Sequence, residues 1–471
     1  MTADEFLKHG HELVEWMAAY MRDAGKYPVK SRVRPGEIFA RIPDQPPEKP
    51  ESFGEFMHDF EEIIMPGITH WQSPNFFAYF PANSSPPSVL AEMITATLGA
   101  QCMIWETSPA ATELEEKMMI WLRDLIGLPR NFEGVIQDSA STSTLAAIIT
   151  AREKATDFNA NDNGTFGNAT LKVYCTEHTH SSVEKAVRIA GIGRKNLVKI
   201  PVQDNFSMDP AKLKASIIED RKRGFLPCCV IATIGTTGIG ATDNLRAIGE
   251  VCAENDVWLH VDAAMGGTPL ILPEFQHFLD GREYIDSFVF NPHKWMFVNF
   301  DCSAYFVRDP ELLIKTFGIL PDYLMTRTRG SVNDYRDWGV PLGRRFRALK
   351  LWSVIRMYGV EGLREKIRYH IRIASALGEM ISREPDFELL APPSMSIVCF
   401  RFKPSGVTGN ELNNLNGNIN HALNDSGKIY LTHTVVNGNY ALRMVTAQTN
   451  VTLQHVERAW ELIMKTAREL A

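Results

Sequence analysis

Short apolar runs that alternate with helix-like stretches dominate the middle of this chain. They are rich in β-branched and aromatic residues, which favour strands, and stretches with helical spacing separate them. The runs lie at 134–137, 171–176, 228–235, 257–264 and 287–292. Strands that alternate with helices in this way pair into a mostly parallel sheet with helices packed on it. The pattern therefore predicts a large α/β domain, placed at 86–350.

The segments on either side of this domain have different patterns. Residues 1–85 are predicted to form a helical segment, because apolar residues such as Leu13 and Trp16 recur with helical spacing over 4–24. Such an apolar face must pack either on its own chain or on a partner subunit, and we assign the segment to dimerisation. A proline-rich connector, IPDQPPEKPESF, follows that helix. Residues 351–471 carry strand-like runs at 396–402 and 440–447 among helices, so a smaller α+β domain is predicted there. The polar stretch 156–170 is predicted to be an exposed loop.

Composition excludes several classes of function. The net charge is −7 and no basic run occurs, so a nucleic-acid partner is not expected. No apolar run is long enough to cross a bilayer, and the N-terminus does not resemble a signal peptide. The seven cysteines are odd in number and contain no CxxC pair, which argues against a disulfide framework and a bound metal. We therefore expect a cytoplasmic protein with reduced thiols.

Two charged residues follow apolar strands closely. Lys294 lies in NPHKW among aromatic residues, which would desolvate its ammonium group, lower its pKa and suit it to Schiff-base chemistry. A single lysine in such a position is more often only a solvated charge. Asp262 ends the strand of HVDAA, where a buried carboxylate is costly unless a cation pairs with it. A protonated ring nitrogen of a cofactor would be such a cation, although helix caps and structural salt bridges are commoner.

Three further strand ends carry polar residues. QDSASTSTL, at 137–145, is a strand-to-helix turn whose hydroxyls and backbone N–H groups could hold a phosphate, although most such turns are ordinary helix caps. His180 follows the strand at 171–176 and could stack on a flat ring, although a single histidine is more often structural. The Gly-Thr-Thr turn within 233–244 is another strand-end loop. Each signal is modest alone, and their order along successive strands makes them informative.

This order, together with four long motifs, resembles the fold-type I pyridoxal-phosphate (PLP) enzymes. The motifs are HWQSPNFFAYFP, VWLHVDAA, NPHKW followed by VNFDCSA, and PLGRRFRALKLW. Over nearly the whole chain they are similar to the group II decarboxylases that act on aromatic L-amino acids. The resemblance implies the fold-type I transferase fold, PLP as cofactor and a homodimer with shared active sites. It also implies decarboxylation of an aromatic L-amino acid, such as tryptophan, 5-hydroxytryptophan or DOPA, to the amine and carbon dioxide.

The resemblance also assigns roles to individual residues. Lys294 would hold the cofactor, Asp262 would pair with its ring nitrogen and His180 would stack on its ring. Tyr323 would return a proton to the substrate. The other expected cofactor residues are Ala140, Ser141, Thr237, Asp243, Ala264, Asn291 and His293, with Ser139 near the phosphate and Asp243 supporting the site. The expected substrate residues are Trp71, Tyr79, Phe80, Pro81, Ala82, Gln101, Met103 and Gly343.

Two other functions are compatible with this pattern. Aromatic aldehyde synthases share the fold and PLP, but plant-type synthases carry Phe at the position of Tyr323 and insect-type synthases carry Asn at that of His180. A non-catalytic homologue would be expected to lack some of the residues that this chain retains. Asp138, Gln101 and Met103 differ from the residues usual at these positions, so the preferred substrate is open.

Overall fold

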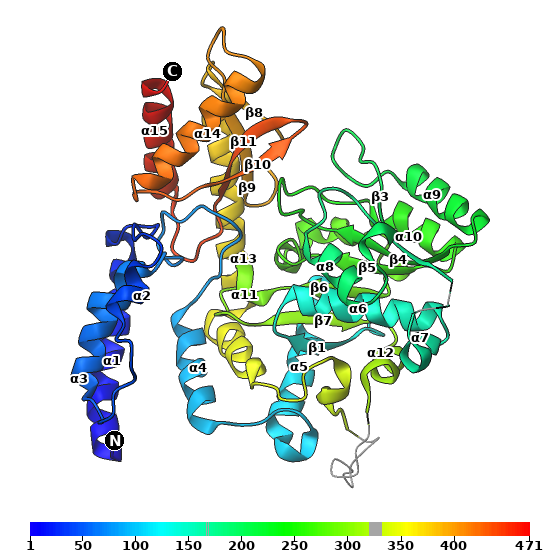
Figure 1. Cartoon of the computed structure of the whole chain (residues 1–471), viewed down its shortest axis with the longest axis horizontal. Helices are drawn as coiled ribbons and strands as arrows, with labels where there is room; N and C mark the ends of the chain where they lie inside the picture. Colours follow the sequence, from blue (N-terminus) through cyan, green and yellow to red (C-terminus); the bar gives the residue numbers. More distant parts are fainter. Residues whose placement is uncertain (166, 168, 320–331) are drawn as a thin grey trace. The chain divides into compact units, whose positions relative to one another are not determined.

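The structure is a computed structural model that describes residues 1–165, 167, 169–319 and 332–471 (Figure 1). The chain divides into two compact units. Unit 1 combines Met1–Ala82 with His370–Ala471, and unit 2 is Asn83–Tyr369. The N-terminal segment and most of the C-terminal segment, which the sequence analysis separated, thus share unit 1. Whether 1–85, 86–350 and 351–471 fold as independent domains stays a prediction.

Unit 2 is built on a seven-stranded sheet in the order β1-β7-β6-β5-β4-β2-β3. Its strands are β1 (Glu133–Gln137), β2 (Leu171–Cys175), β3 (Leu197–Lys199), β4 (Leu226–Thr233), β5 (Trp258–Asp262), β6 (Ser287–Phe290) and β7 (Ser303–Val307). Only β7 runs antiparallel to its neighbours, β1 and β6. This confirms the predicted α/β fold with a mostly parallel sheet.

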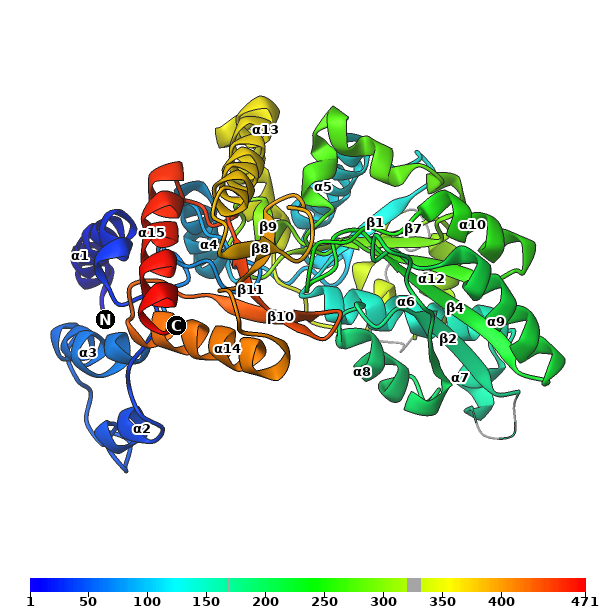
Figure 2. The ribbon, with the colours of Figure 1, turned by 90° about the horizontal axis from the view of Figure 1, so that it is seen from above.

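Helices cover both faces of this sheet (Figure 2). On one face lie α6 (Ala140–Ala155) and α8 (Ser182–Ile189), and on the other α5 (Pro109–Ile126) and α10 (Leu245–Glu254). The remaining helices of unit 2 are α4 (Pro86–Leu98), α7 (Asn159–Asn163), α9 (Pro210–Lys222), α11 (Pro292–Trp295) and α12 (Pro310–Phe317). Small and apolar residues of α6, such as Ala147 and Ile148, pack against Val173 and Val289 in the core. The prediction of a loop at 156–170 was wrong in part, because α7 forms there and buries Ala160.

Unit 1 contains an antiparallel sheet in the order β10-β11-β9-β8, which confirms the predicted α+β character of the C-terminal region. The strands are β8 (Phe387–Leu389), β9 (Ile397–Phe402), β10 (Thr432–Val436) and β11 (Asn439–Val445). Its helices are α1 (Ala3–Asp23), α2 (Glu37–Arg41), α3 (Phe53–Asp59), α14 (Gly409–Asp425) and α15 (Leu453–Glu469), and α13 (Arg347–Ser382) passes from unit 2 into unit 1. Among the described residues, no helix combines the length and apolarity needed to span a bilayer.

Candidate active site

The carboxyl ends of four adjacent strands, β2, β4, β5 and β6, carry the central candidate residues. The registers of β4, β5 and β6 align Thr233 with Asp262 and Asp262 with Val289. Lys294 lies in α11, directly after β6, and His180 follows β2, the neighbour of β4. Because these four strands are parallel, the residues that follow them meet at one edge of the sheet, where α/β proteins bind ligands.

His180 lies within electrostatic reach of both Asp262 and Lys294. Partial desolvation lowers the pKa of its imidazole below the ordinary value, Lys294 lowers that pKa further, and the carboxylate of Asp262 opposes both effects. The backbone N–H of Ser182 donates to Nδ1 of His180 at 3.2 Å, so the neutral ring carries its proton on Nε2. The His180 side chain is exposed, which leaves room for a planar group against the ring.

Asp262 is a buried carboxylate, 5% exposed. The backbone N–H of Ala264 donates to its Oδ1 at 3.0 Å. Within the described ranges no residue donates to the second oxygen and no cation forms a salt bridge with the carboxylate. A buried carboxylate is stabilised by a cation more than by any neutral partner. The site therefore fits a cofactor that brings its own protonated ring nitrogen, as PLP does.

The first turn of α6 and Asn291 belong to one hydrogen-bonded network. Ser139 is the N-cap of α6 and accepts from the N–H of Thr142 at 3.3 Å. The hydroxyl of Ser143 donates to the Ser139 carbonyl at 3.1 Å and lies 3.4 Å from the hydroxyl of Ser303, which donates to Oδ1 of Asn291 at 2.6 Å. Ala140 and Ser141 follow the cap, where helical N–H groups lack intrahelical acceptors. Such a turn can hold a phosphate.

His293 adds a neutral donor beside Lys294. Burial lowers the pKa of His293 to about 3, with a further contribution from the Lys294 charge. The backbone N–H of Cys302 donates to Nδ1 of His293 at 2.8 Å, so the ring proton sits on Nε2. No described residue accepts a hydrogen bond from that Nε2. The group is therefore available to an anion such as a phosphate.

Both carboxylate oxygens of Asp243 accept hydrogen bonds from the backbone. Its Oδ1 accepts from the N–H of Met208 at 2.6 Å and its Oδ2 from the N–H of Thr233 at 2.7 Å. Burial raises the pKa of this carboxyl to about 6. Asp243 thus fixes the turn that carries the half-buried Thr237. On the neighbouring strand ends, the N–H of Asn291 donates to the carbonyl of Ala264 at 3.0 Å and joins two more of the expected cofactor residues.

Gln101, Met103 and Gly343 form a second group in unit 2. Oε1 of Gln101 accepts from the N–H of Arg344 at 2.6 Å, and a Cβ on Gly343 would lie 3.4 Å from Nε2 of Gln101. The carbonyl of Met103 accepts from the N–H of Arg336 at 2.9 Å. These backbone and amide contacts hold the loop after α4 against the segment that precedes α13.

A buried ion pair anchors this second group. The guanidinium of Arg344 pairs with Glu115 of α5 at 2.5 Å and also donates to the carbonyls of Cys102 and Ile136. Its cation lies over the ring of Tyr335, 4.8 Å from the centroid. Because Ile136 belongs to β1, the pair ties the loop of Gln101 to the central sheet.

The aromatic residues that are expected to bind the substrate cluster in unit 1. The ring of Trp71 stacks on that of Tyr79 with centroids 5.7 Å apart, and the Tyr79 hydroxyl lies 3.3 Å from the hydroxyl of Tyr430. The guanidinium of Arg443 lies 5.0 Å from the centroid of the Phe80 ring and donates to the Tyr79 carbonyl at 2.9 Å. Pro81 is buried and the carbonyl of Ala82 accepts from Gln72 at 2.7 Å.

The sequence analysis missed Tyr430 and Arg443. Arg443 is 3% exposed, and burial lowers the pKa of its guanidinium to about 10. A charged residue inside the apolar strand YALRMV was a signal that could have singled it out. Tyr430 precedes β10 and carries no comparable signal in the sequence.

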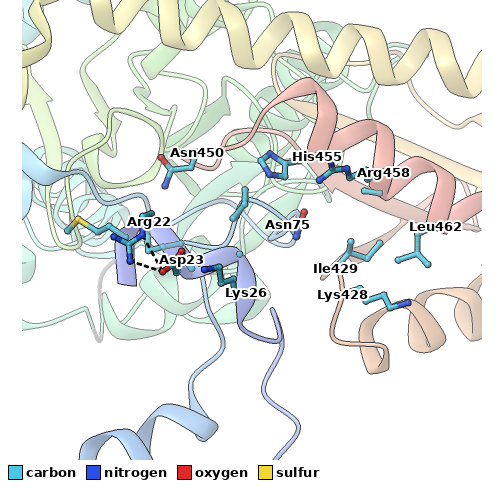
Figure 3. A pocket seen from close by; sticks show the side chains of 16 residues that line it. Arg22, Asp23, Lys26, Asn75, Lys428, Ile429, Asn450, His455, Arg458 and Leu462 are labelled. Carbon is cyan, nitrogen blue, oxygen red and sulfur yellow. Dashed lines mark hydrogen bonds and ion pairs between the residues drawn. The ribbon is translucent and has the colours of Figure 1, made fainter. Parts of the chain in front are cut away.

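A separate pocket of about 710 Å³ opens in unit 1 (Figure 3). Side chains from the end of α1, from the short turn at 24–26 and from α15 line it, including the cations Arg22, Lys26 and Arg458. Arg22 and Lys26 both pair with Asp23. None of the residues expected to bind cofactor or substrate lines this pocket, so it is distinct from the candidate active site.

Tyr323, the expected proton donor, lies outside the described residues. The second tyrosine of this region, Tyr335, is buried in η10 (Tyr335–Trp338), where its ring packs edge-on against Trp338 with centroids 5.4 Å apart. Burial raises the pKa of Tyr335 well above its ordinary value. Its position is that of a core residue.

Comparison with known proteins shows the family to which the chain belongs. The profile of the pyridoxal-dependent decarboxylase conserved domain matches residues 35–403. Aromatic-L-amino-acid decarboxylase of Sus scrofa is 41% identical over 100% of this chain and 98% of its own. Phenylacetaldehyde synthase of Arabidopsis thaliana is 38% identical over 100% of this chain and 97% of its own. The solved structure of Oryza sativa TDC with PLP and tryptamine superposes with a TM-score of 0.97 at 35% identity, covering 100% of this chain and 99% of that one.

The profile match covers most of the chain, and both relatives are similar to it from end to end. The strand-end lysine, the buried aspartate without a cation and the phosphate-type helix turn fit the cofactor that this profile names. The chain belongs to the family of pyridoxal-dependent decarboxylases.

Proposed function

We propose that this protein uses PLP to decarboxylate an aromatic L-amino acid, releasing the arylalkylamine and carbon dioxide. The observation that carries the proposal is the buried carboxylate of Asp262, which lacks a cation among the described residues and acts with Lys294 on the same histidine. Tryptophan, 5-hydroxytryptophan and DOPA are the candidate substrates. Support comes from the names of the relatives and from the tryptamine in the rice structure.

Each residue at the sheet edge binds a different part of the cofactor. The amine of Lys294 holds the cofactor, Asp262 pairs with its ring nitrogen and the exposed face of His180 stacks on the ring. The N–H groups of Ala140 and Ser141 and the Nε2–H of His293 hold the phosphate. When bound, PLP supplies an electron sink for the electron pair that remains on the substrate carbon when carbon dioxide leaves.

Each residue also contributes to the chemical steps. The negative charge of Asp262 keeps the proton on the ring nitrogen, which stabilises charge as it develops. His180 presents its Nε2 proton toward the substrate side and helps to orient the substrate. Tyr323 returns a proton to the substrate carbon after carbon dioxide has left. The aromatic residues Trp71, Tyr79 and Phe80, with Pro81 and Ala82, form the wall against which the substrate ring packs.

An aromatic aldehyde synthase is the second candidate function, because one such enzyme is 38% identical to this chain from end to end. Plant-type synthases carry Phe where this chain has Tyr323, and insect-type synthases carry Asn where it has His180. Both residues here are of the decarboxylase type. We therefore infer that amine, and not aldehyde, is the main product.

We also infer that the protein is a homodimer. The amphipathic helix α1 buries none of its residues, and its Phe6 and Leu7 are 64% and 59% exposed. Helix α4 exposes a further apolar set, Leu90, Met93, Ile94 and Leu98. Apolar faces of this kind are covered in the assembled protein. Gln101 and Met103, which follow α4, would then reach the active site of the second copy.

A cytoplasmic location is inferred from the thiols. The seven cysteines are all buried and form no disulfide with one another, and the sequence has no feature that favours nucleic acid or membrane as a partner. The partner expected at the site is a small aromatic amino acid.

The proposed function is tested by incubating the PLP-loaded protein with tryptophan, 5-hydroxytryptophan, DOPA, tyrosine, phenylalanine and histidine. Amine, carbon dioxide, aldehyde and peroxide are measured for each. The proposal predicts equal amounts of amine and carbon dioxide from at least one aromatic substrate, with histidine far behind. Aldehyde and peroxide as main products would identify a synthase, and failure to bind PLP would identify a non-catalytic homologue.

A further inference from the structure

The turn 299–302 joins α11 to β7 and holds His293 at two points. The backbone N–H of Cys302 donates to Nδ1 of His293 at 2.8 Å, and the His293 N–H donates back to the Cys302 carbonyl at 3.2 Å. The imidazole also packs on the ring of Phe300, with centroids 4.7 Å apart. The donor that selects the tautomer of His293 is thus the peptide group between Asp301 and Cys302.

The side chain of Asp301 is held by two parallel hydrogen bonds. Nε of Arg347 donates to Oδ1 at 2.9 Å and a terminal nitrogen of Arg347 donates to Oδ2 at 3.2 Å. Both side chains are mostly buried, with exposed fractions of 13% and 16%. A paired guanidinium–carboxylate contact fixes direction as well as distance. The pair therefore fixes the orientation of the peptide that begins at Asp301.

The other end of the turn is fixed from α4. The N–H of Asn299 donates to the hydroxyl of Ser88 at 2.7 Å. The side-chain amide of Asn299 also donates to Oε2 of Glu92 at 3.5 Å, one turn further along α4, and the same oxygen of Glu92 pairs with the buried Lys350 of α13 at 2.9 Å. The turn is thus held between α4 and the start of α13 at both ends, and Asp301 is the member next to the donor of His293.

We propose that Asp301 and Arg347 are positioning residues that set the tautomer of His293. By orienting the N–H of Cys302 toward Nδ1, the pair keeps the proton of His293 on Nε2, where it can donate to the phosphate of the cofactor. The inference rests on the proposed function only in requiring that the protein bind PLP. Arg347 and Asp301 act through His293 and do not touch the cofactor themselves.

The test is the affinity of the apoenzyme for PLP, measured by absorbance titration. Asp301→Asn keeps the size of the side chain and removes its charge, and Arg347→Met removes the other partner. Each variant should weaken PLP binding by roughly tenfold or more, the usual weight of a charge-assisted hydrogen bond. Arg368→Met is the matched control, because Arg368 lies on the same helix and makes the same paired contact with Glu274, at 2.6 and 3.0 Å. It should leave PLP affinity unchanged.

A double-mutant cycle separates positioning from general loss of structure. His293→Gln removes the Nδ1 acceptor, so in that background Asp301→Asn should cost little further affinity. Thermal melting of each apoenzyme shows whether the variants fold as the Arg368→Met control does. Equal loss of affinity from Asp301→Asn with and without His293→Gln would overturn the inference. Unchanged PLP affinity in Asp301→Asn would overturn it as well.

The same titration distinguishes this inference from the proposed function. If the unsubstituted protein binds PLP and produces amine while Asp301→Asn binds PLP equally well, the positioning inference fails and the function stands. If the unsubstituted protein binds no PLP, the proposed function fails first.

Discussion

Tyr323 and Tyr335 are close in sequence but are expected to have unrelated roles. Tyr335 is buried against Trp338 beneath the cation of Arg344, whereas we propose that Tyr323 returns the proton to the substrate. Tyr323→Phe keeps the ring and removes the phenolic hydroxyl that would supply the proton, so the carbanion left after loss of carbon dioxide persists and dissolved oxygen can react with it. The variant should consume oxygen and release aldehyde, ammonia and peroxide with little amine. Product analysis and an oxygen electrode measure this.

Tyr335→Phe is the matched control for that experiment, since it removes a phenol of the same region from a core position. It should still release amine. Amine from Tyr323→Phe at the unmodified rate, without peroxide, would show that Tyr323 is not the donor.

We expect Gly343, which lies beside Gln101, to leave room for an indole or a catechol. A Cβ there would lie 3.4 Å from Nε2 of Gln101, an ordinary contact distance, so a serine fits without strain but takes up space. Gly343→Ser should therefore fold normally and lower kcat/KM for tryptophan by about 1–3 kcal/mol, or roughly tenfold to more than a hundredfold. Steady-state kinetics on tryptophan and tyrosine check this. An equal loss for both substrates would contradict a role in specificity.

Residues at or shortly after the ends of apolar strands were the ones that the sequence could single out as candidates. Lys294, Asp262 and His180 are such residues, because their positions depend only on the nearest strand. Arg443 and Asp301 were not, because their importance comes from partners far away in the chain. The cation of Arg443 lies over Phe80, and Asp301 depends on Arg347. Such pairings become visible only when the chain is folded.

At the scale of elements, the spacing of apolar residues and the composition of the turns predicted the strands whose ends carry the candidate site residues. The sequence analysis did not identify β3 and β7 of the large sheet, nor β8 and β10 of the small one. β3 has only three residues, and β7 follows β6 closely and runs antiparallel to it, so the expected crossover helix is missing. α7 was predicted to be a loop because its sequence, NANDN, is polar apart from Ala160, which is the residue that the helix buries.

The exposed apolar face of α4 is the element on which we test the predicted dimer. Ile94→Glu and Leu98→Glu place charges where Ile94 and Leu98 are 52% and 61% exposed. Each should weaken the dimer at least about tenfold, since burying an unpaired charge is costly. Sedimentation of the variants gives the oligomeric state, and amine production should fall with it.

Ile189→Glu on α8 is the control, because Ile189 is equally exposed at 61% and lies on a different element. It should remain a dimer with normal activity. A fully active monomer, in the unsubstituted protein or in the α4 variants, would count against shared active sites.

At the scale of the whole molecule, the two ends of the chain combine in one unit. The N–H of Phe77 donates to the carbonyl of Tyr430, and the N–H of Val445 donates to the carbonyl of Phe77. These backbone bonds attach the aromatic segment 70–82 to the C-terminal sheet. A local sequence pattern cannot indicate a pairing between segments more than 350 residues apart. For this reason the sequence analysis treated the two ends of the chain as separate segments.

The identity of the cofactor lysine is the claim on which the whole account depends. Lys350 is the alternative candidate for the lysine that binds PLP, because burial lowers its pKa to about 8. Its amine, however, is paired with Glu92 at 2.9 Å. Borohydride reduction of the PLP-loaded protein makes the link between lysine and cofactor permanent, and peptide mass spectrometry then locates it. The account predicts the label on Lys294, and its loss in Lys294→Ala together with amine production. A label on Lys350, or amine production by Lys294→Ala at the normal rate, would contradict it.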